Sequence, residues 1–593
     1  MRTKRASAFL ILAALAPVGV LAADCNLQEQ LELPVAMNGL RPTVPVQFNG
    51  SDATMVLDTG AFYSTITTAT AAEFGLKPYS APFGFGLRGV TGATDASLTR
   101  VKDFILGKMP WHNVEFIVGG TEPGGGAVGL LGENVLRIVD VEYDLSHGVI
   151  RFWHPEGCRK NGLAYWAKDL PYSAIDIDRT DARHTQPIGS AWINGIRIRV
   201  LFDTGAATSV MTMEAAERAG VKPDGPGVIP AGHSFGVGAR LVRNWIAPFE
   251  SFKIGDEEIR NTHLRIGEIT LFDADMLLGA DFFLSHRIYI SNIQNKLYFS
   301  YNGGAVFNLK TAPESEKPAP GADPAAEQTT PPTGNGEPVD AASYARRGEG
   351  FAARRDYEHA IADLTRACQL DPTEPMYLYE RGRAYWQNSQ KDLALSDFNA
   401  SLKLRPDDAY VLLARAELRL ALRDQTGAAS DFQMASASAP GEADLHFAIA
   451  QAYVRIGLMT EAVTEFTLWI PVHEADSKWA AAMNGRCWAR ALLGQELEKA
   501  LDDCTAALKV YPKSATFLDS RGLVRLRQGD FKKSLADYDE AINLHSANAW
   551  TFYGRGIDKL RLGLAAEGQT DIEVARALRP DIREEAAKYG ITP

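Results

Sequence analysis

Two aspartates stand in matching surroundings that suit acid–base chemistry. Asp58 and Asp203 each begin the tetrapeptide Asp-Thr-Gly-Ala, follow an apolar run and precede a hydroxyl side chain, Ser64 or Ser209. Two carboxyl groups about 3 Å apart cannot both ionise cheaply, so they share a proton. One of them then accepts a proton from a bound water while the other donates to a carbonyl oxygen. Such chemistry requires the fold to bring the two aspartates together, which the tripeptides alone do not establish.

The elements around each aspartate are duplicated as well. An Asn-Gly pair, typical of a tight β-hairpin turn, ends eight residues before each aspartate, at Gly50 and Gly195. The sequence Leu-Leu-Gly follows each aspartate by about 75 residues and ends at Gly132 and Gly279. Short alternating apolar runs indicate strands from about residue 31 to residue 301. The first half of the chain is therefore predicted to hold two copies of one β module.

On these paired motifs the chain resembles the retropepsin-like aspartic proteases, duplicated within one chain, over about residues 30 to 300. The resemblance implies two lobes related by a pseudo-twofold axis, each with its aspartate in a tight turn, the Leu-Leu-Gly strand beside it and a short helix after it. It also implies that Asp58 and Asp203 are a catalytic pair that meets within a monomer, or alternatively that each lobe pairs with its counterpart in another molecule. Water is then the nucleophile, and no cofactor is implied. The residues that would support the two turns are Thr59, Gly60, Thr204 and Gly205.

The residue after each Asp-Thr-Gly bears on the working pH. Some relatives carry Ser or Thr there, whose hydroxyl stabilises an ionised carboxylate, whereas Ala61 and Ala206 offer none. We therefore expect the pair to titrate higher and to work nearer neutral pH. The family also places a mobile flap between each aspartate and its Leu-Leu-Gly, where the chain is rich in glycine, with an ordinary surface turn as the alternative. The flap candidates are Gly86, Gly89, Gly236 and Gly238.

The second half of the chain has helical apolar spacing and a different repeat. Helix-stopping prolines recur every 34 positions, at Pro372, Pro406 and Pro440. Small and large residues at fixed places resemble the tetratricopeptide repeat, in which two antiparallel helices interlock and successive pairs stack. Seven units and a closing helix are expected, with an extra residue in the fifth unit near Glu496. The matching residues of the first unit are Tyr344, Gly348, Phe351, Ala360, Leu364, Ala367 and Pro372.

Charge and the start of the chain bear on partners and location. The 593 residues carry 61 Lys plus Arg against 73 Asp plus Glu, a net charge of −12, which disfavours nucleic acid and anionic lipid surfaces as partners. A basic start, an apolar run and the small residues before Asp24 indicate a signal peptide of an exported bacterial protein, periplasmic or secreted. The alternative is a retained membrane anchor.

Five cysteines are too few for a disulfide-built scaffold, so the cores must come from apolar burial. After export, Cys25 and Cys158 either form a disulfide or stay free. Cys487 and Cys504 fall on successive helices of one repeat. They either form a disulfide or stay as buried free thiols. No closely spaced set of His, Cys or carboxylate residues predicts a metal site.

The expected fold class is therefore multidomain, an all-β acid-protease-like double lobe followed by an all-α tetratricopeptide solenoid. The two resemblances imply a protein or peptide substrate for the lobes and a protein partner on the concave face of the solenoid, with a non-catalytic binding scaffold as the alternative. A Pro-rich linker would tether the solenoid and raise the effective concentration of substrate. The expected boundaries are signal peptide 1–23, lobe 1 24–160, lobe 2 161–302, linker 303–340 and repeat domain 341–593.

Overall fold

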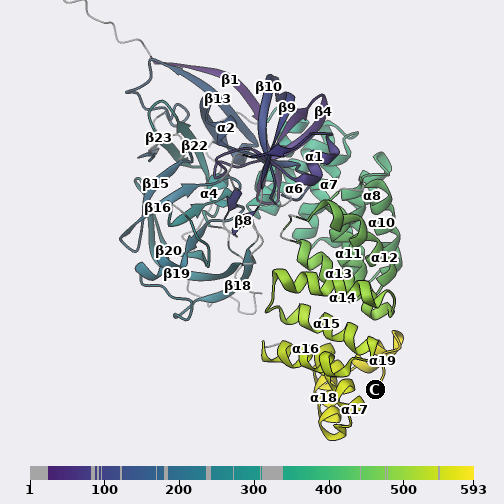
Figure 1. Ribbon diagram of the computed structural model, residues 1–593. Helices are drawn as coiled ribbons and strands as arrows, with labels where there is room; N and C mark the ends of the chain where they lie inside the picture. The colour runs from purple at the N-terminus through teal and green to yellow at the C-terminus, as the bar shows by residue number, and fades with distance from the viewer. Residues whose placement is uncertain are drawn as a thin grey trace, which may run out of the picture.

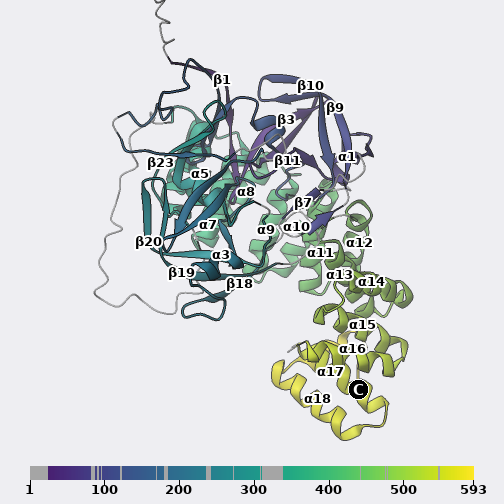
Figure 2. The same cartoon turned by 60° about the vertical axis from the view of Figure 1, so that its left-hand side comes forward.

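The computed structural model describes most of residues 25–593 as two β lobes and a helical array (Figure 1). The array begins beside the first lobe and runs away from both lobes, so that its C-terminal end lies farthest from them (Figure 2). This is the fold class that the sequence predicts. The gaps in the described residues are 82–86, 90–91, 95, 121–122, 169, 179–184, 235–241, 272, 308, 310–337, 441–442, 475, 477 and 545–547.

Six strands of lobe 1 close into a barrel. They are β3 (Arg41–Phe48), β4 (Ser51–Leu57), β5 (Thr65–Ile66), β9 (Ser97–Leu106), β10 (Met109–Val118) and β11 (Gly129–Leu131). Each pairs with the next in the order β3, β4, β11, β5, β10 and β9, and β9 pairs back with β3. Asn49 and Gly50, both with positive φ, form the expected tight turn between β3 and β4. The other elements around this barrel are β2 (Ala36–Asn38), α1 (Thr68–Glu73), β6 (Tyr79–Ser80), β7 (Leu87–Gly89), β8 (Gly92–Thr94) and α2 (Glu133–Leu136).

Lobe 2 repeats the barrel with the same connectivity. Its strands are β15 (Ile188–Ile193), β16 (Ile196–Phe202), β17 (Val210–Thr212), β19 (Val242–Ile254), β20 (Glu257–Gly267) and β21 (Met276–Leu278). They pair in the order β15, β16, β21, β17, β20 and β19, and β19 pairs back with β15. The remaining elements are α3 (Met213–Arg218), β18 (Ile229–Ser234) and α4 (Ala280–Ser285). The duplication expected from the sequence is thus a duplication of the fold.

A six-stranded sheet joins the two lobes. Its order is β1 (Asn26–Pro34), β13 (Val149–Glu156), β12 (Asp140–Asp144), β22 (His286–Ser291), β23 (Lys296–Tyr301) and β14 (Ser173–Asp176). At its centre β12 of lobe 1 pairs antiparallel with β22 of lobe 2. Arg287 on β22 donates to the buried Glu142 on β12 at 2.8 Å, and Arg151 on β13 donates to the same carboxylate at 2.9 Å. The lobes therefore share one sheet and one apolar core.

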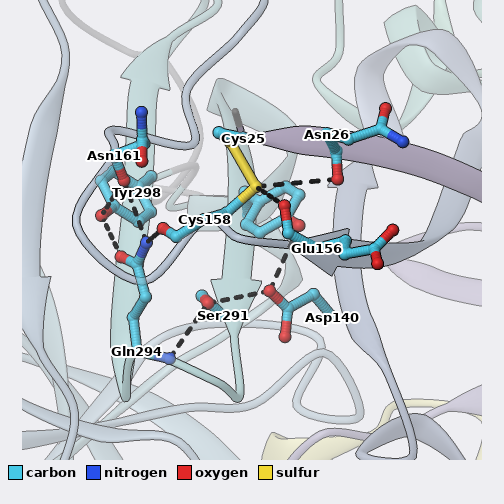
Figure 3. The surroundings of a disulfide bond; sticks show 10 residues. Cys25, Asn26, Asp140, Glu156, Cys158, Asn161, Ser291, Gln294 and Tyr298 are labelled. Atoms are coloured by element: carbon cyan, nitrogen blue, oxygen red, sulfur yellow. Dashed lines mark hydrogen bonds between the residues drawn. A yellow bond between two sulfur atoms is a disulfide. The ribbon is translucent and has the colours of Figure 1, made fainter. Parts of the chain in front are cut away.

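A disulfide closes lobe 1. Cys25 and Cys158 are bonded just before β1 and just after β13, which settles the option that the sequence left open (Figure 3). Gln294, on the turn between β22 and β23, donates to the carbonyl oxygen of Cys158 at 2.6 Å and so ties this end to lobe 2. A second disulfide joins Cys487 and Cys504 in the array.

Seven antiparallel helix pairs and a closing helix form the described array. In chain order they are α5 (Ala341–Ala353), α6 (Tyr357–Leu370), α7 (Pro375–Gln387), α8 (Lys391–Leu404), α9 (Ala409–Ala421), α10 (Gln425–Ser438), α11 (Leu445–Ile456), α12 (Met459–Trp469), α13 (Trp479–Leu493), α14 (Leu497–Val510), α15 (Ala515–Gln528), α16 (Phe531–Asn543), α17 (Ala549–Arg561), α18 (Ala565–Leu578) and α19 (Ile582–Lys588). The small residue at each crossing lets the helices approach: a Cβ built on Gly382 would lie 2.7 Å from the ring of Phe398. The expected seven units are therefore present.

Six of the seven helix pairs also carry an ion pair that the sequence analysis did not single out. An Arg on the first helix donates through Nε and Nη2 to both carboxylate oxygens of an Asp on the second. The spacing is sixteen residues, except for seventeen in the fifth pair, where the extra residue lies. In the fourth pair a contact between His446 Nδ1 and Glu465 Oε2, at 2.6 Å, takes the place of the Arg–Asp ion pair. The pairs are Arg347–Asp363, Arg381–Asp397, Arg415–Asp431, Arg486–Asp503, Arg521–Asp537 and Arg555–Asp571.

Helix α5 packs directly on lobe 1, a contact that the sequence analysis did not predict. Ala353 packs against the core that the lobes share. Arg354 donates to the carbonyl oxygen of Gly303 at 3.2 Å, beside the end of lobe 2. Buried contacts of this kind fix the first repeat in place, so the attachment is a docked interface.

Several expectations fall outside the described residues. They include the signal peptide 1–23 and most of the linker 303–340. Along the part of the chain that is described, no helix combines the length and the apolar character needed to cross a bilayer.

Candidate active site

Each aspartate stands at the end of a barrel strand and is held by the strand beside it. Asp58 directly follows β4, and Asp203 directly follows β16. The backbone N–H of Asp58 donates to Leu131 O at 3.0 Å, and that of Asp203 donates to Leu278 O at 2.9 Å. Both acceptors belong to the Leu-Leu-Gly strands, β11 and β21, which run parallel to β4 and β16. In each copy the Leu-Leu-Gly strand therefore positions the aspartate of the Asp-Thr-Gly turn.

The two turns face each other so closely that only glycine fits beside each aspartate. A Cβ built on Gly60 would overlap the carboxyl group of Asp203, and a Cβ built on Gly205 would overlap that of Asp58. The two carboxyl groups hydrogen bond to each other. The Asp58 residue is only 9% exposed. The structure thus brings the two aspartates together within one chain.

Burial and the closeness of the two carboxyl groups shift the pKa of both Asp58 and Asp203. The pKa of Asp58 lies well above its ordinary value, because the group is buried, because the charge of Asp203 opposes a second charge, and because its proton is bonded to Asp203. Burial also raises the pKa of Asp203, against the opposing effects of the hydrogen bond from Asp58 and of the backbone N–H groups of Ala206 and Gly205, at 3.1 and 2.9 Å. Asp58 accepts the equivalent N–H of its own turn, from Ala61, at 2.8 Å. The pKa of both carboxyl groups is therefore raised, which favours one proton shared by the pair. The effect expected of alanine at positions 61 and 206 stays a prediction.

Thr59 and Thr204 lock the turns across the boundary between the lobes. The hydroxyl of Thr59 donates to Phe202 O at 2.7 Å, and the hydroxyl of Thr204 donates to Leu57 O at 2.8 Å. Each bond reaches the backbone of the opposite barrel immediately before its aspartate. The threonines therefore act on the spacing of the carboxyl pair and take no part in proton transfer.

In each lobe a serine and a second polar side chain also support the turn. The sequence analysis identified the two serines but missed their partners, Asn134 and Asp281. The hydroxyl of Ser64 donates to Asn134 Oδ1 at 2.7 Å, and that of Ser209 donates to Asp281 Oδ1 at 2.7 Å. Each serine oxygen also accepts the N–H of the Leu-Leu-Gly glycine at 3.0 Å. Asn134 and Asp281 both stand two residues after that glycine, a shared spacing that could have revealed them. Burial raises the pKa of Asp281 to about 6.

The structure describes only part of the flap candidates. Gly89 ends strand β7, which pairs with β8 as a separate two-stranded hairpin, with Gly89 opposite Gly92. Gly86, Gly236 and Gly238 lie outside the described residues. The segment around Gly89 is therefore a hairpin, the form that a flap requires.

A cavity of about 670 Å³ lies in lobe 2 beside α3, lined by Thr212, Met213 and the loop between β20 and β21. Neither Asp58 nor Asp203 lines it. Leu271, which lines this cavity, packs against the same apolar cluster as Ala206. Within the described ranges, no group of three or more His, Cys, Asp or Glu side chains is arranged to hold a metal ion.

Comparison with known families agrees with this geometry. Residues 44–135 match the aspartyl protease family, residues 190–285 match the gag-polyprotein aspartyl protease family, and residues 379–443 match the tetratricopeptide repeat. No curated protein sequence matches the chain.

Solved structures that resemble the chain are tetratricopeptide repeat proteins. One from Parabacteroides merdae is 15% identical, covers 42% of this chain and 99% of its own, and has a TM-score of 0.32. The repeat protein YrrB, whose structure is described as having an unusual peptide-binding site, is 16% identical over 32% of this chain and 97% of its own, with a TM-score of 0.29. The C-terminal part of a repeat protein from Cytophaga hutchinsonii is 14% identical over 42% of this chain and 99% of its own, with a TM-score of 0.31.

The two protease-family ranges each contain one Asp-Thr-Gly turn and its Leu-Leu-Gly strand, and the third range falls within the helical array. The chain therefore carries two domains of the aspartyl protease families followed by a tetratricopeptide repeat array.

Proposed function

We propose that the protein is an aspartic endopeptidase that hydrolyses peptide bonds with Asp58 and Asp203. The observation that carries the proposal is the buried, hydrogen-bonded carboxyl pair, in which each member packs against the glycine of the opposite turn. The family match around each aspartate supports it. A non-catalytic scaffold would need neither this pairing nor the proton held between the two groups.

We propose that Asp58 carries the proton of the pair and that Asp203 is ionised, and that the two groups divide the work accordingly. Asp203, the ionised member, accepts a proton from a water whose oxygen attacks the carbonyl carbon of the scissile peptide. Asp58 donates its proton to the carbonyl oxygen, which gives a neutral tetrahedral diol. As the C–N bond breaks, the proton on Asp203 passes to the leaving nitrogen, and Asp58 recovers a proton from a diol hydroxyl. Water and the peptide thus account for every atom of the two products.

Cleavage of a mixed peptide library across pH tests the proposal. We expect Asp58→Asn and Asp203→Asn each to abolish cleavage, because either change removes one proton-transfer group. Asp176→Asn is the matched control, since this carboxylate is 82% exposed on β14. Cleavage that survives in one of the two variants would indicate same-lobe pairing between molecules. No cleavage by the unaltered protein at any pH would favour the binding scaffold.

We further propose that the enzyme acts as a monomer, because one chain supplies both aspartates. Measurement of mass in solution under assay conditions tests this proposal, and activity confined to a dimer would contradict it. The array is proposed to bind a protein or peptide on its concave face, as substrate recruiter or partner site. Cross-linking followed by mass mapping of the cross-linked helices would identify that face.

Export to the periplasm or the medium belongs to the same proposal. The two disulfides, Cys25–Cys158 and Cys487–Cys504, support it, because such bonds form and persist in oxidising compartments. N-terminal sequencing of the protein from the cell envelope tests it. A chain that begins near Ala23 or Asp24 supports export with cleavage, and a membrane-bound chain that retains Met1 would indicate an anchor.

A further inference from the structure

The first helix of the array, α5, is hydrogen-bonded to lobe 1 through a buried carboxyl group. Glu349 on α5 accepts a hydrogen bond from the backbone N–H of Met37 at 2.9 Å. The two residues are 9% and 4% exposed, and Met37 lies in β2, which pairs with the start of β3. Gly350 approaches the neighbouring turn so closely that a Cβ there would lie 2.9 Å from Ser146 O. Helix α5 and the β2–β3 hairpin thus form one packed unit.

The same hairpin holds a loop of lobe 1 that the array also touches. Asn38 and Arg41 donate side-chain hydrogen bonds to carbonyl oxygens of the Pro123–Val128 loop, the first at 3.1 Å. Tyr410, near the start of α9, places its phenol against this loop at Gly126. A Cβ built on that glycine would lie 3.0 Å from the Tyr410 oxygen. The loop therefore contacts both the hairpin and the third repeat, with Gly125 and Gly126 still exposed.

The Pro123–Val128 loop leads without interruption to Asp58. The N–H of Val128 donates to Thr54 O on β4 at 2.8 Å, and β11 begins at the next residue. At the end of β11, Leu131 accepts the backbone N–H of Asp58 at 3.0 Å. Strand β11 thus connects the loop directly to the turn that holds Asp58, so a displacement of the loop would also displace that turn.

We propose that the repeat array is a positioning element of the carboxyl pair: helices α5 and α9 hold the Pro123–Val128 loop, and through β11 they hold Asp58 in its working geometry. The inference rests on the proposed hydrolytic function, because Asp58 is one of its two reacting groups. Glu349 and Tyr410 are positioning residues, since neither touches the reacting atoms. The array then contributes to the chemistry of the lobes as well as to binding.

Two substitutions in the full-length protein test this role. Tyr410→Ala removes the contact with the loop, and Glu349→Ala removes the bond to the hairpin. Met434→Ala is the matched control, because this side chain on α10 belongs to the same repeat and is 43% exposed. Amide hydrogen exchange of residues 123–131 is measured together with kcat and KM for a cleaved peptide. The exchange is also measured in the Asp203→Asn background, where no cleavage is needed.

We expect faster exchange of residues 123–131 in both test variants and unchanged exchange in the Met434→Ala control. We also expect kcat to fall by about 10-fold to 100-fold with KM unchanged, since a misplacement of about 1 Å at a reacting group has an effect of that order. Tyr410 is 41% exposed, so its truncation leaves the array folded, which circular dichroism checks. Unchanged exchange in both variants, or a loss confined to KM, would overturn the inference. Faster exchange in a protein that cleaves nothing would support the positioning contact and overturn the proposed function.

Discussion

Thr59 and Thr204 bind each other reciprocally across the boundary between the lobes: the backbone N–H of each donates to the hydroxyl oxygen of the other, at 3.1 and 3.0 Å. Each hydroxyl in turn donates to a carbonyl oxygen of the opposite barrel. Both residues are fully buried, so no water replaces a partner that is lost. The spacing of the carboxyl pair therefore depends on a closed set of four hydrogen bonds.

Thr59→Val keeps the shape of the side chain and removes its hydroxyl. We expect the free energy of unfolding to fall by about 2–4 kcal/mol, because the N–H of Thr204 and the carbonyl of Phe202 both lose a buried partner. We also expect kcat to fall, because the turns lose their register. Thr99→Val is the control: Thr99 is equally buried, and its hydroxyl donates to Lys77 O at 3.2 Å away from the pair. Denaturant unfolding and kcat are measured for both, and an equal loss of kcat would contradict the role of Thr59.

Cleavage is expected to follow a bell-shaped pH profile that belongs to the pair as a whole. Activity needs one carboxyl group protonated and the other ionised, and burial raises the pKa of both Asp58 and Asp203. The maximum of kcat/KM should therefore lie above the ordinary aspartate value of about 3.9. Ala61→Ser supplies a hydroxyl beside Asp58 that stabilises the ionised form, so this variant should shift the profile to lower pH. A maximum below about pH 4 in the unaltered protein would contradict the prediction.

The buried Arg–Asp pairs of the array should contribute far more to the free energy of unfolding than the exposed acidic residues beside them. Asp503, only 3% exposed, accepts from Arg486 at 2.8 and 2.7 Å and from Arg490 at 2.6 Å. We expect Asp503→Ala to lower the free energy of unfolding by about 3–5 kcal/mol, because it leaves two guanidinium groups without their buried partner. Asp502→Ala, an exposed neighbour on the same helix, should cost under about 0.5 kcal/mol. Urea unfolding followed by circular dichroism measures the difference, and similar values for the two variants would refute it.

Docking of the array on lobe 1 is expected to weaken as the pH rises. Burial and the nearby Glu380 raise the pKa of Glu349 from 4.5 to about 8, against the opposing effects of Arg383, Arg346 and the Met37 N–H. Between these two values the unfolded state binds fewer protons than the folded state, so the free energy of unfolding falls as the pH rises. Glu349→Gln removes this titration and should flatten that part of the profile. Thermal unfolding of both proteins from pH 5 to pH 9 provides the measurement, and parallel profiles would contradict it.

The two Asp-Thr-Gly turns could be predicted because their determinants are local and repeated. Asp-Thr-Gly, the Asn-Gly turn and Leu-Leu-Gly each specify a short piece of backbone, and the two copies confirm each other. The Arg–Asp pairs were visible in the sequence as well, since Arg381 and Asp397 recur at the same spacing in most units. They were missed because apolar spacing alone already identifies the repeat.

The docking of the array could not be predicted in this way. Glu349 and Met37 are separated by 312 positions, and a glutamate on a helix gives no sign of whether it faces water or a backbone N–H. The same holds for Tyr410 and the loop at Gly126: the run of three glycines at 124–126 predicts a loop, but not which side chain packs against it. Contacts between separately folded parts depend on their relative placement, which local spacing does not encode.

The sheet shared by the lobes has a consequence for biosynthesis. Its central strand β12 is made early, but its neighbour β22 belongs to the last part of lobe 2, and β23 ends at Tyr301. A nascent chain emerging N-terminus first therefore carries both aspartates before it has the strands that bring their barrels face to face. The order of synthesis therefore keeps the two carboxyl groups apart until the strands of both lobes have been made.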